Sequence, residues 1–149
     1  MFKYIFVTII LFHICLCDDI INQKLEAISK DSVQLLANGK HSQWKDLLDD
    51  HVTIMSMGKT YNGKKGVDTY IKDLNIQSST ITLTTPINAN DYYSTFAKKL
   101  EGGFKNGCLF SVPNIVQLIH FNNKLKIDKW VEHFPSNFDE MRFCQKTEL

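Results

Sequence analysis

Apolar residues in the first part of the chain recur every three or four positions, which is the spacing of one face of an α-helix. Between Asp18 and Asn38 this face is formed by Ile21, Leu25, Ile28, Ser32 and Leu35. Gly39 follows at once, and glycine readily takes the left-handed conformation with which many helices end. The pattern therefore predicts a long amphipathic helix over residues 18–38.

Two shorter helices are predicted before the pattern changes. Ser42 can cap a helix that carries Trp44 on its apolar side and ends at the acidic pair Asp49-Asp50. A strand is then expected at Val52–Met57, followed by turn residues. Helical spacing returns at Val67, Tyr70, Ile71 and Leu74, which predicts the third helix.

The apolar period falls to two in the second half of the chain, as expected for half-buried β-strands. The predicted strands cover residues 79–85, 92–100, 108–121 and 124–134. Strands that follow one another with short connections pair antiparallel. Three helices before a run of antiparallel strands predict a single α+β domain.

The last two strands are joined by Asn122-Asn123, and asparagine tolerates the positive φ of a two-residue hairpin turn. Such a turn pairs Gln117 with Asp128 and Ile115 with Trp130. Both faces of the paired strands are substantially apolar, so each is expected to meet another layer, a pocket or a partner.

The first residues have the form of a secretory signal peptide. Lys3 precedes an apolar run over Tyr4–Cys17, and the acidic pair Asp18-Asp19 follows it. We expect cleavage near Cys17, so that residues 1–17 are the leader, residues 18–135 the domain and residues 136–149 a C-terminal tail. A buried N-terminal element is the alternative.

Charge and hydropathy exclude two classes of partner. Without the leader, the chain carries equal numbers of basic and acidic side chains, which favours neither nucleic acid nor an anionic membrane surface. The apolar leader is too short to cross a bilayer core of about 30 Å, and no later segment is longer, so we expect no membrane span.

The cysteines and the last four residues extend the secretory interpretation. Cys108 and Cys144 remain after processing and are expected to form a disulfide, with two separate thiols as the alternative. The chain ends in Lys146–Leu149, which resembles the retrieval signal of the endoplasmic reticulum. Secretion and residence in that compartment both remain open.

The order of elements resembles the nuclear transport factor 2-like superfamily, in particular its SnoaL-like branch. The resemblance covers about Asp18 to Phe134 and includes Tyr61–Val67 before the third helix and Lys124–Phe134 at the end. It implies a strongly bent antiparallel sheet wrapped around the long helix, a cone-shaped cavity, and frequent homodimers formed through the outer face of the sheet. The superfamily hosts many activities, so the fold implies no single function.

The resemblance also selects which residues face the cavity. In members similar to limonene epoxide hydrolase, the last strand carries a tryptophan and a pocket carboxylate, and Trp130 and Glu132 stand at the matching positions. The Arg-x-Asp of that site has no match in Asp91–Glu101, so its reaction is not supported. For a site like that of ketosteroid isomerase, only Tyr92, Tyr93 and Asp128 can be suggested.

The expected cavity-lining residues are Trp44, Met55, Gln117, Asp128, Trp130 and Glu132, while Ile127 and Val131 are expected to point away. A carboxylate against an aromatic wall in a dry pocket would have a raised pKa and could transfer protons. The histidines lack zinc-site spacing, and we expect neither metal nor cofactor.

Two hypotheses follow. The leading one is a non-catalytic domain that binds a small apolar molecule in the cone. The alternative is an isomerase, cyclase or hydrolase that uses Glu132 as its acid–base group, and a solvated carboxylate at a strand end would support neither. A second buried polar group bonded to Glu132 would favour the enzyme, and an all-apolar cavity would favour binding.

Overall fold

The computed structural model of the chain describes residues 2–137 and 142–143, with side chains from Asp18 to Asn137. The helices are α1 (Phe2–Ala37), α2 (His41–Asp46) and α3 (Gly63–Leu74). The strands are β1 (Leu48–Ser56), β2 (Lys59–Asn62), β3 (Ile76–Leu83), β4 (Asn88–Asn90), β5 (Tyr93–Phe104), β6 (Leu109–Phe121), β7 (Ile127–His133) and β8 (Arg142–Phe143).

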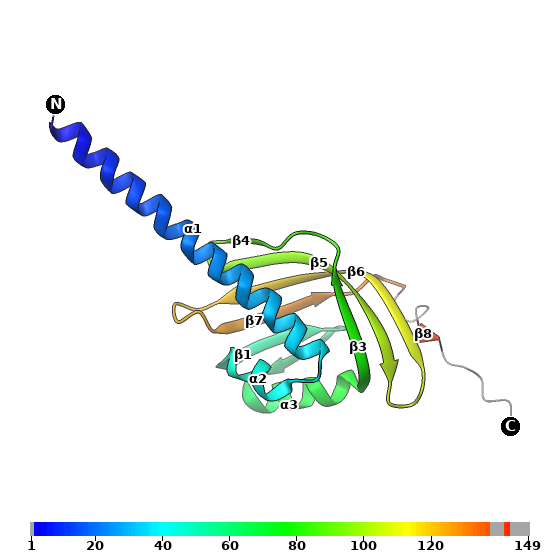
Figure 1. The fold of residues 1–149 in the computed structure, drawn as a ribbon. Coiled ribbons are helices and arrows are strands. Elements are labelled where there is room, and N and C mark those ends of the chain that lie inside the picture. Colours follow the sequence, from blue (N-terminus) through cyan, green and yellow to red (C-terminus); the bar gives the residue numbers. More distant parts are fainter. Residues whose placement is uncertain (1, 138–141, 144–149) are drawn as a thin grey trace, which may run out of the picture.

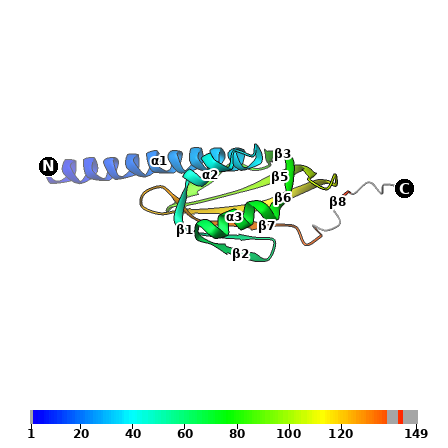
Figure 2. The ribbon, with the colours of Figure 1, turned by 90° about the horizontal axis from the view of Figure 1, so that it is seen from below.

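Helix α1 lies along one face of the curved sheet, and its N-terminal part extends beyond the sheet (Figures 1 and 2). It buries Leu25, Ser29, Ser32, Val33 and Leu36. Of the predicted face, Leu25 and Ser32 are buried, whereas Ile21, Ile28 and Leu35 are only half-buried, so the buried face is rotated from the predicted one. Gly39 has a φ of 69°, and the Lys40 amide donates to the Leu35 carbonyl at 2.9 Å, so the helix ends as predicted. The helix begins at Phe2 and runs through the predicted leader without a break.

The predicted boundaries of the second helix are wrong at both ends. The residue before α2 is Lys40, and no side chain caps the helix, so Ser42 does not have that role. The helix is followed directly by β1, which contains both Asp49 and Asp50. The Ile127 amide donates to the Leu47 carbonyl at 2.9 Å, so pairing with a distant strand starts β1 four residues before the predicted Val52.

The sheet has the strand order β2-β1-β7-β6-β5-β3, with β4 paired to β5 and β8 paired to β6. Neighbouring strands are antiparallel except β1 and β7, which are parallel. The sheet curls without closing, and three helices precede β3, which confirms the predicted α+β fold class. Strands β2 and β4 are short additions that the sequence pattern did not predict.

The predicted register of the last hairpin is wrong by four residues. Gln117 pairs with Glu132, and Ile119 pairs with Trp130. The connection is longer than two residues because the Asn122 side chain accepts hydrogen bonds from the amides of Lys124 and Lys126, at 2.9 and 3.1 Å. A shift of four residues keeps each side chain on its predicted face but changes its partner across the strands.

A β-bulge near the start of β7 changes the direction of two side chains. The pairing with β6 shifts between His120 and Phe121, so that Phe121 pairs with Ile127 and His120 with Lys129. Ile127 is consequently buried in the main core, contrary to the prediction that it points away from Trp130. Asp128 is placed on the opposite face, where it hydrogen-bonds His120.

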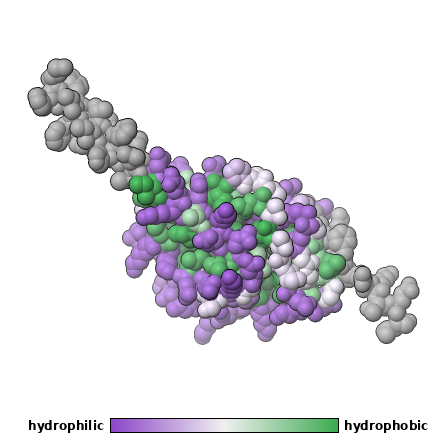
Figure 3. All heavy atoms as spheres, in the orientation of Figure 1, coloured by the Kyte–Doolittle hydropathy of each residue, from purple (hydrophilic) through white to green (hydrophobic). Residues whose placement is uncertain are grey.

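The main core lies between the helices and the inner face of the sheet, and it includes Trp44, Ile54, Tyr70, Ile119 and Trp130. A smaller cluster of Phe110, Val112 and Ile115 lies in the N-terminal half of β6. On the face that carries α1, hydrophobic residues are interspersed with hydrophilic ones (Figure 3). Among the described residues, no helix is long and apolar enough to cross a membrane.

Candidate functional site

A cavity of about 600 Å³ lies between the end of α1, helix α3 and strands β3 and β5. Its apolar lining includes Leu36, Ile71, Leu74, Ile76, Ile81, Leu100 and Phe134. Its polar lining includes Asn38, His41, Asp68, Lys72, Gln77, Ser78, Lys98, Lys105 and Glu132. The size is within the range of about 300–1,000 Å³ that is typical of small-molecule sites.

A buried ion pair forms one part of the cavity wall. Lys98 on β5 and Glu132 on β7 are brought together by β6, which lies between their strands. The Lys98 Nζ is 2.7 Å from the Glu132 Oε1, and the two side chains are only 2% and 5% exposed. Two charges removed from water in this way need full hydrogen bonding to be tolerated.

Glu132 receives that bonding from three donors. Besides Lys98 on Oε1, the Ser56 hydroxyl and the Tyr70 hydroxyl each donate to Oε2 at 2.8 Å. Burial by itself would raise the pKa of the Glu132 carboxyl, but the Lys98 charge and the hydrogen bonds outweigh burial and hold the pKa below its usual range. The predicted raised pKa is therefore wrong, because the prediction did not include Lys98.

The pKa of Tyr70 is shifted in the opposite direction to that of Glu132. Burial, and then the adjacent Glu132 charge, raise the pKa of the Tyr70 hydroxyl well above its usual range. The phenol therefore stays protonated and remains a hydrogen-bond donor at neutral pH. The site consequently contains an ionised carboxylate together with a neutral hydroxyl that it cannot deprotonate in the resting state.

Lys98 is held by two further contacts. Its Nζ donates to the Gln117 Oε1 at 2.7 Å and lies 5.3 Å from the centre of the Trp130 ring, which adds a cation–π interaction. The Gln117 Nε2 in turn donates to the Val131 carbonyl at 3.0 Å, which fixes the direction of its amide. The ammonium is thus positioned from three sides.

An aromatic layer supports the ion pair. Trp44 contacts Trp130 edge-on with ring centres 5.4 Å apart, and it also contacts Tyr70 at 5.9 Å. All three side chains are at most 1% exposed. Trp44 and Trp130 form part of the core next to the cavity and support the ion pair, while Tyr70 also lines the cavity.

Of the six expected pocket residues, only Glu132 lines the cavity, three more are buried beside it, and two lie elsewhere. Trp44, Gln117, Trp130 and Glu132 form one buried group. Met55 is 40% exposed, because it alternates with the buried Ile54 and Ser56 along β1. Asp128 is bonded to the His120 Nδ1 at 2.5 Å on the outer face, so neither Met55 nor Asp128 belongs to the site.

The aromatic candidates for an isomerase-like site also lie elsewhere. Tyr92 and Tyr93 are 37% and 45% exposed, and Tyr93 stacks on His120 at 4.4 Å. Lys98 is the residue that the sequence interpretation missed. A signal was present, because alternation along β5 places it on the same face as the buried Ser94 and Phe96.

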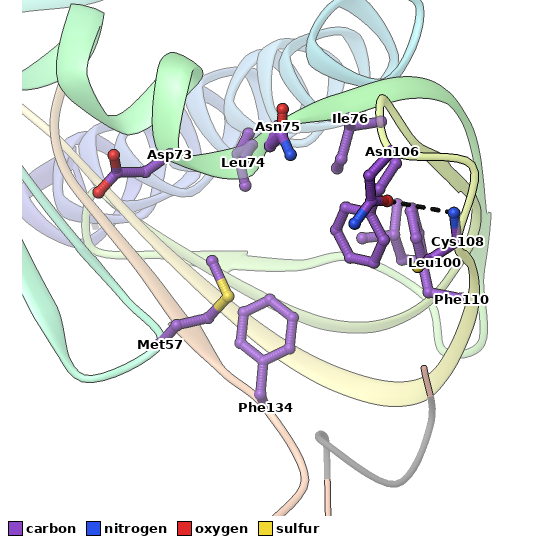
Figure 4. A pocket seen from close by; sticks show the side chains of 11 residues that line it. Met57, Asp73, Leu74, Asn75, Ile76, Leu100, Asn106, Cys108, Phe110 and Phe134 are labelled. Atoms are coloured by element: carbon purple, nitrogen blue, oxygen red, sulfur yellow. Dashed lines mark hydrogen bonds between the residues drawn. The ribbon is translucent and has the colours of Figure 1, made fainter. Parts of the chain in front are cut away.

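A second cavity of about 230 Å³ adjoins the first and is shown in Figure 4. Leu74, Ile76, Leu100 and Phe134 line both cavities. Met57 lies beside Phe134 in this view, and the Cys108 amide donates to the Asn106 Oδ1 at 3.1 Å. In residues 2–137 and 142–143, no three His, Cys, Asp or Glu side chains are grouped so that they could hold a metal ion.

No protein-family model matches the sequence, and no curated protein matches it. A solved structure that is similar in fold is described as the epoxide hydrolase/cyclase-like enzyme SalBIII, with a role in pyran ring formation in polyether salinomycin. The TM-score is 0.68 at 17% identity, and the match covers 78% of this chain and 94% of that chain. At this identity the likeness shows the fold alone, which is an α+β fold with a curled, unclosed sheet wrapped around a long helix.

Proposed function

We propose that this domain binds a small, largely apolar molecule in the cavity beside the Lys98–Glu132 ion pair. The observation that carries the proposal is a cavity of about 600 Å³ whose lining is partly apolar, next to an ion pair whose bonds are already satisfied within the protein. Such a pair needs no ligand to neutralise it. It can stabilise the cavity wall while the apolar lining provides the affinity.

The state of Glu132 supports binding over proton donation. A general acid must be protonated at the working pH, and the lowered pKa keeps Glu132 ionised. In the enzymes that the sequence resembles, an arginine is followed two residues later by an aspartate. Here Lys98 is followed two residues later by Leu100, which carries no ionisable group.

The test is to expose the purified full chain to a lipid and metabolite extract and to identify retained molecules by mass spectrometry. Gln77→Trp would place a large side chain at the cavity edge and should reduce retention. Thr80→Trp is the matched control, because Thr80 is exposed on the same strand and does not line the cavity. Equal retention by both variants would contradict the proposal.

An acid–base enzyme remains the second candidate, because one observation favours it. Glu132 has buried polar partners in Ser56, Tyr70 and Lys98, which is the feature expected of an enzyme. In this role the ionised Glu132 would act as a base. Following extract composition over time tests this, since only an enzyme would convert a component. The double variant Lys98→Met/Glu132→Gln, which leaves no unpaired charge buried, should lose that conversion while its urea unfolding shows that it is folded.

We also propose that the chain enters the secretory pathway, on the grounds of its apolar N-terminus and its last four residues. N-terminal sequencing of material from expressing cells should find a start near Asp18. Deleting Lys146–Leu149 should raise secretion if these residues act as a retrieval signal. Material that still begins at Met1 would contradict the cleavage, and unchanged export after the deletion would contradict retention.

Pairing of two copies through the outer face of the sheet is proposed on the basis of exposed apolar residues. Tyr93 and Val116 lie on this face and are 45% and 47% exposed. Val116→Lys should shift the mass measured by light scattering from dimer to monomer. A monomeric wild type would contradict the proposal.

A further inference from the structure

The charged residues that line the main cavity leave an excess of positive charge. Its two acidic residues are each paired, Asp68 with Lys45 and Glu132 with Lys98. Two lining lysines, Lys72 on α3 and Lys105 after β5, are exposed and form no ion pair with any described side chain. Their charges are available at the solvent side of the cavity.

Asp73, the neighbour of Lys72, does not remove this excess. Its Oδ2 accepts hydrogen bonds from the Lys59 Nζ at 2.9 Å and from the Tyr61 hydroxyl at 3.1 Å. In Figure 4 its carboxylate points away from the aromatic side chains of the smaller cavity. Lys59 forms the direct ion pair with Asp73, and the Lys72 charge is the smallest of the contributions that lower the pKa of Asp73.

The pKa of His41, which also lines the cavity, is affected by nearby lysines. Burial lowers the pKa of its imidazole, and the charges of Lys45 and Lys105 lower it further. The histidine is therefore neutral at neutral pH and adds no charge of its own. Burial is the larger cause of this shift, and the two lysine charges act in the same direction.

The lining away from these lysines is apolar and continues into the smaller cavity. Leu74, Ile76, Leu100 and Phe134 are shared by the two cavities, and Met57, Phe104 and Phe110 lie beyond them. Figure 4 shows the labelled side chains of this group facing a common space. A hydrocarbon chain that enters from the lysine side could lie along these apolar side chains, while Asp73, Asn75 and Asn106 supply the polar part of the smaller cavity's lining.

We propose that the cavity binds an amphipathic carboxylate, with its hydrocarbon chain along the Leu74–Leu100–Phe134 wall and its carboxylate beside Lys72 and Lys105. This inference rests on the proposed binding function and specifies the chemical class of the ligand. Carboxylates are stabilised by unpaired ammonium groups at a partly desolvated site, whereas a cationic head group would be repelled.

Isothermal titration calorimetry of the full chain with three probes of equal chain length provides the test. Dodecanoate should bind more tightly than dodecanol, and dodecyltrimethylammonium should bind most weakly. Replacing Lys72 and Lys105 together by Gln should weaken dodecanoate about three- to tenfold, as expected for two partly screened charges. The affinity for dodecanol should stay unchanged in that variant.

The control removes two lysines from the other side of the molecule. Lys124 and Lys129 are exposed and lie away from the cavity, so their joint replacement by Gln should leave both affinities within about twofold. Equal binding of dodecanoate and dodecanol, or an equal loss in both double variants, would overturn the carboxylate proposal while ligand binding stands. If none of the three probes binds, the carboxylate proposal fails, and retention from the extract then decides ligand binding separately.

Discussion

Replacing Lys98 by Met should destabilise the fold far more than most single substitutions. Lys98 is 1% exposed, and its removal leaves the buried Glu132 carboxylate with only the Ser56 and Tyr70 hydroxyls as donors. Leaving one member of a buried ion pair unpaired typically costs about 3–5 kcal/mol, and methionine fills a similar volume, so little of the loss comes from a cavity. We expect a loss of this size in the free energy of unfolding at pH 7.

The assay is urea unfolding followed by the fluorescence of the buried Trp44 and Trp130. Adding Glu132→Gln to Lys98→Met should recover at least about 2 kcal/mol, because the buried charge is then gone. Lys99→Met is the matched control, since its ion pair with Glu101 is exposed and should contribute at most about 1 kcal/mol. A similar loss for both lysines, or a double variant no more stable than Lys98→Met, would refute the reasoning.

The pH dependence of the same variants gives an independent check. In the wild type, the folded-state pKa of Glu132 lies below the ordinary 4.5, so its contribution is present above pH 4.5 and is lost as the pH falls through the lower folded value. Without Lys98, burial should raise this pKa above 4.5. The variant should then gain stability relative to the wild type as the pH falls from neutral toward 4.5.

Two further predictions concern the region where β5 meets β3 and the end of the chain. Gly102→Ala should cost about 1–3 kcal/mol, because a Cβ there would lie 2.1 Å from the Ser78 carbonyl oxygen, whereas at Gly103 the nearest atom is 3.6 Å away. Thermal unfolding should therefore separate the two alanine variants, and equal melting temperatures would contradict this explanation. Cys144 lies outside the described residues, and its disulfide with Cys108 stays a prediction that is supported by the pairing of β8 with β6. Denatured but unreduced protein should not react with an alkylating reagent, the loop closure should stabilise by about 3–4 kcal/mol, and labelling of both thiols would show that the bond is absent.

Local sequence patterns were sufficient for the longer elements and for part of the inner face, but not for the short strands β2 and β4. The spacing of apolar residues located α1 and α3, and Gly39 located the end of α1, because both depend on residues close together in the chain. Strand alternation correctly placed Trp130 and Glu132 on one face, since the period of two is unaffected by a register shift of four.

The sequence patterns gave wrong predictions where the start of a strand or its register depends on residues far away in the chain. The start of β1 was decided by its parallel pairing with β7, and the hairpin register was decided by the side-chain bonds of Asn122. Asp128 is turned outward by a bulge in the pairing of β6 with β7. None of these has a signal in the local period of apolar residues.

The sequence by itself determined that this chain forms an α+β fold with Glu132 on the buried face of its last long strand. Only the tertiary structure decided the hydrogen-bond partners and the direction of the pKa shift of that carboxylate. Lys98 approaches from a strand two positions away in the sheet, and Tyr70 approaches from a helix, so their charge and hydrogen bonds reach Glu132 through space. Because a buried group's pKa depends on such neighbours as well as on burial, the sequence pattern could locate Glu132 but gave the wrong direction for its pKa shift.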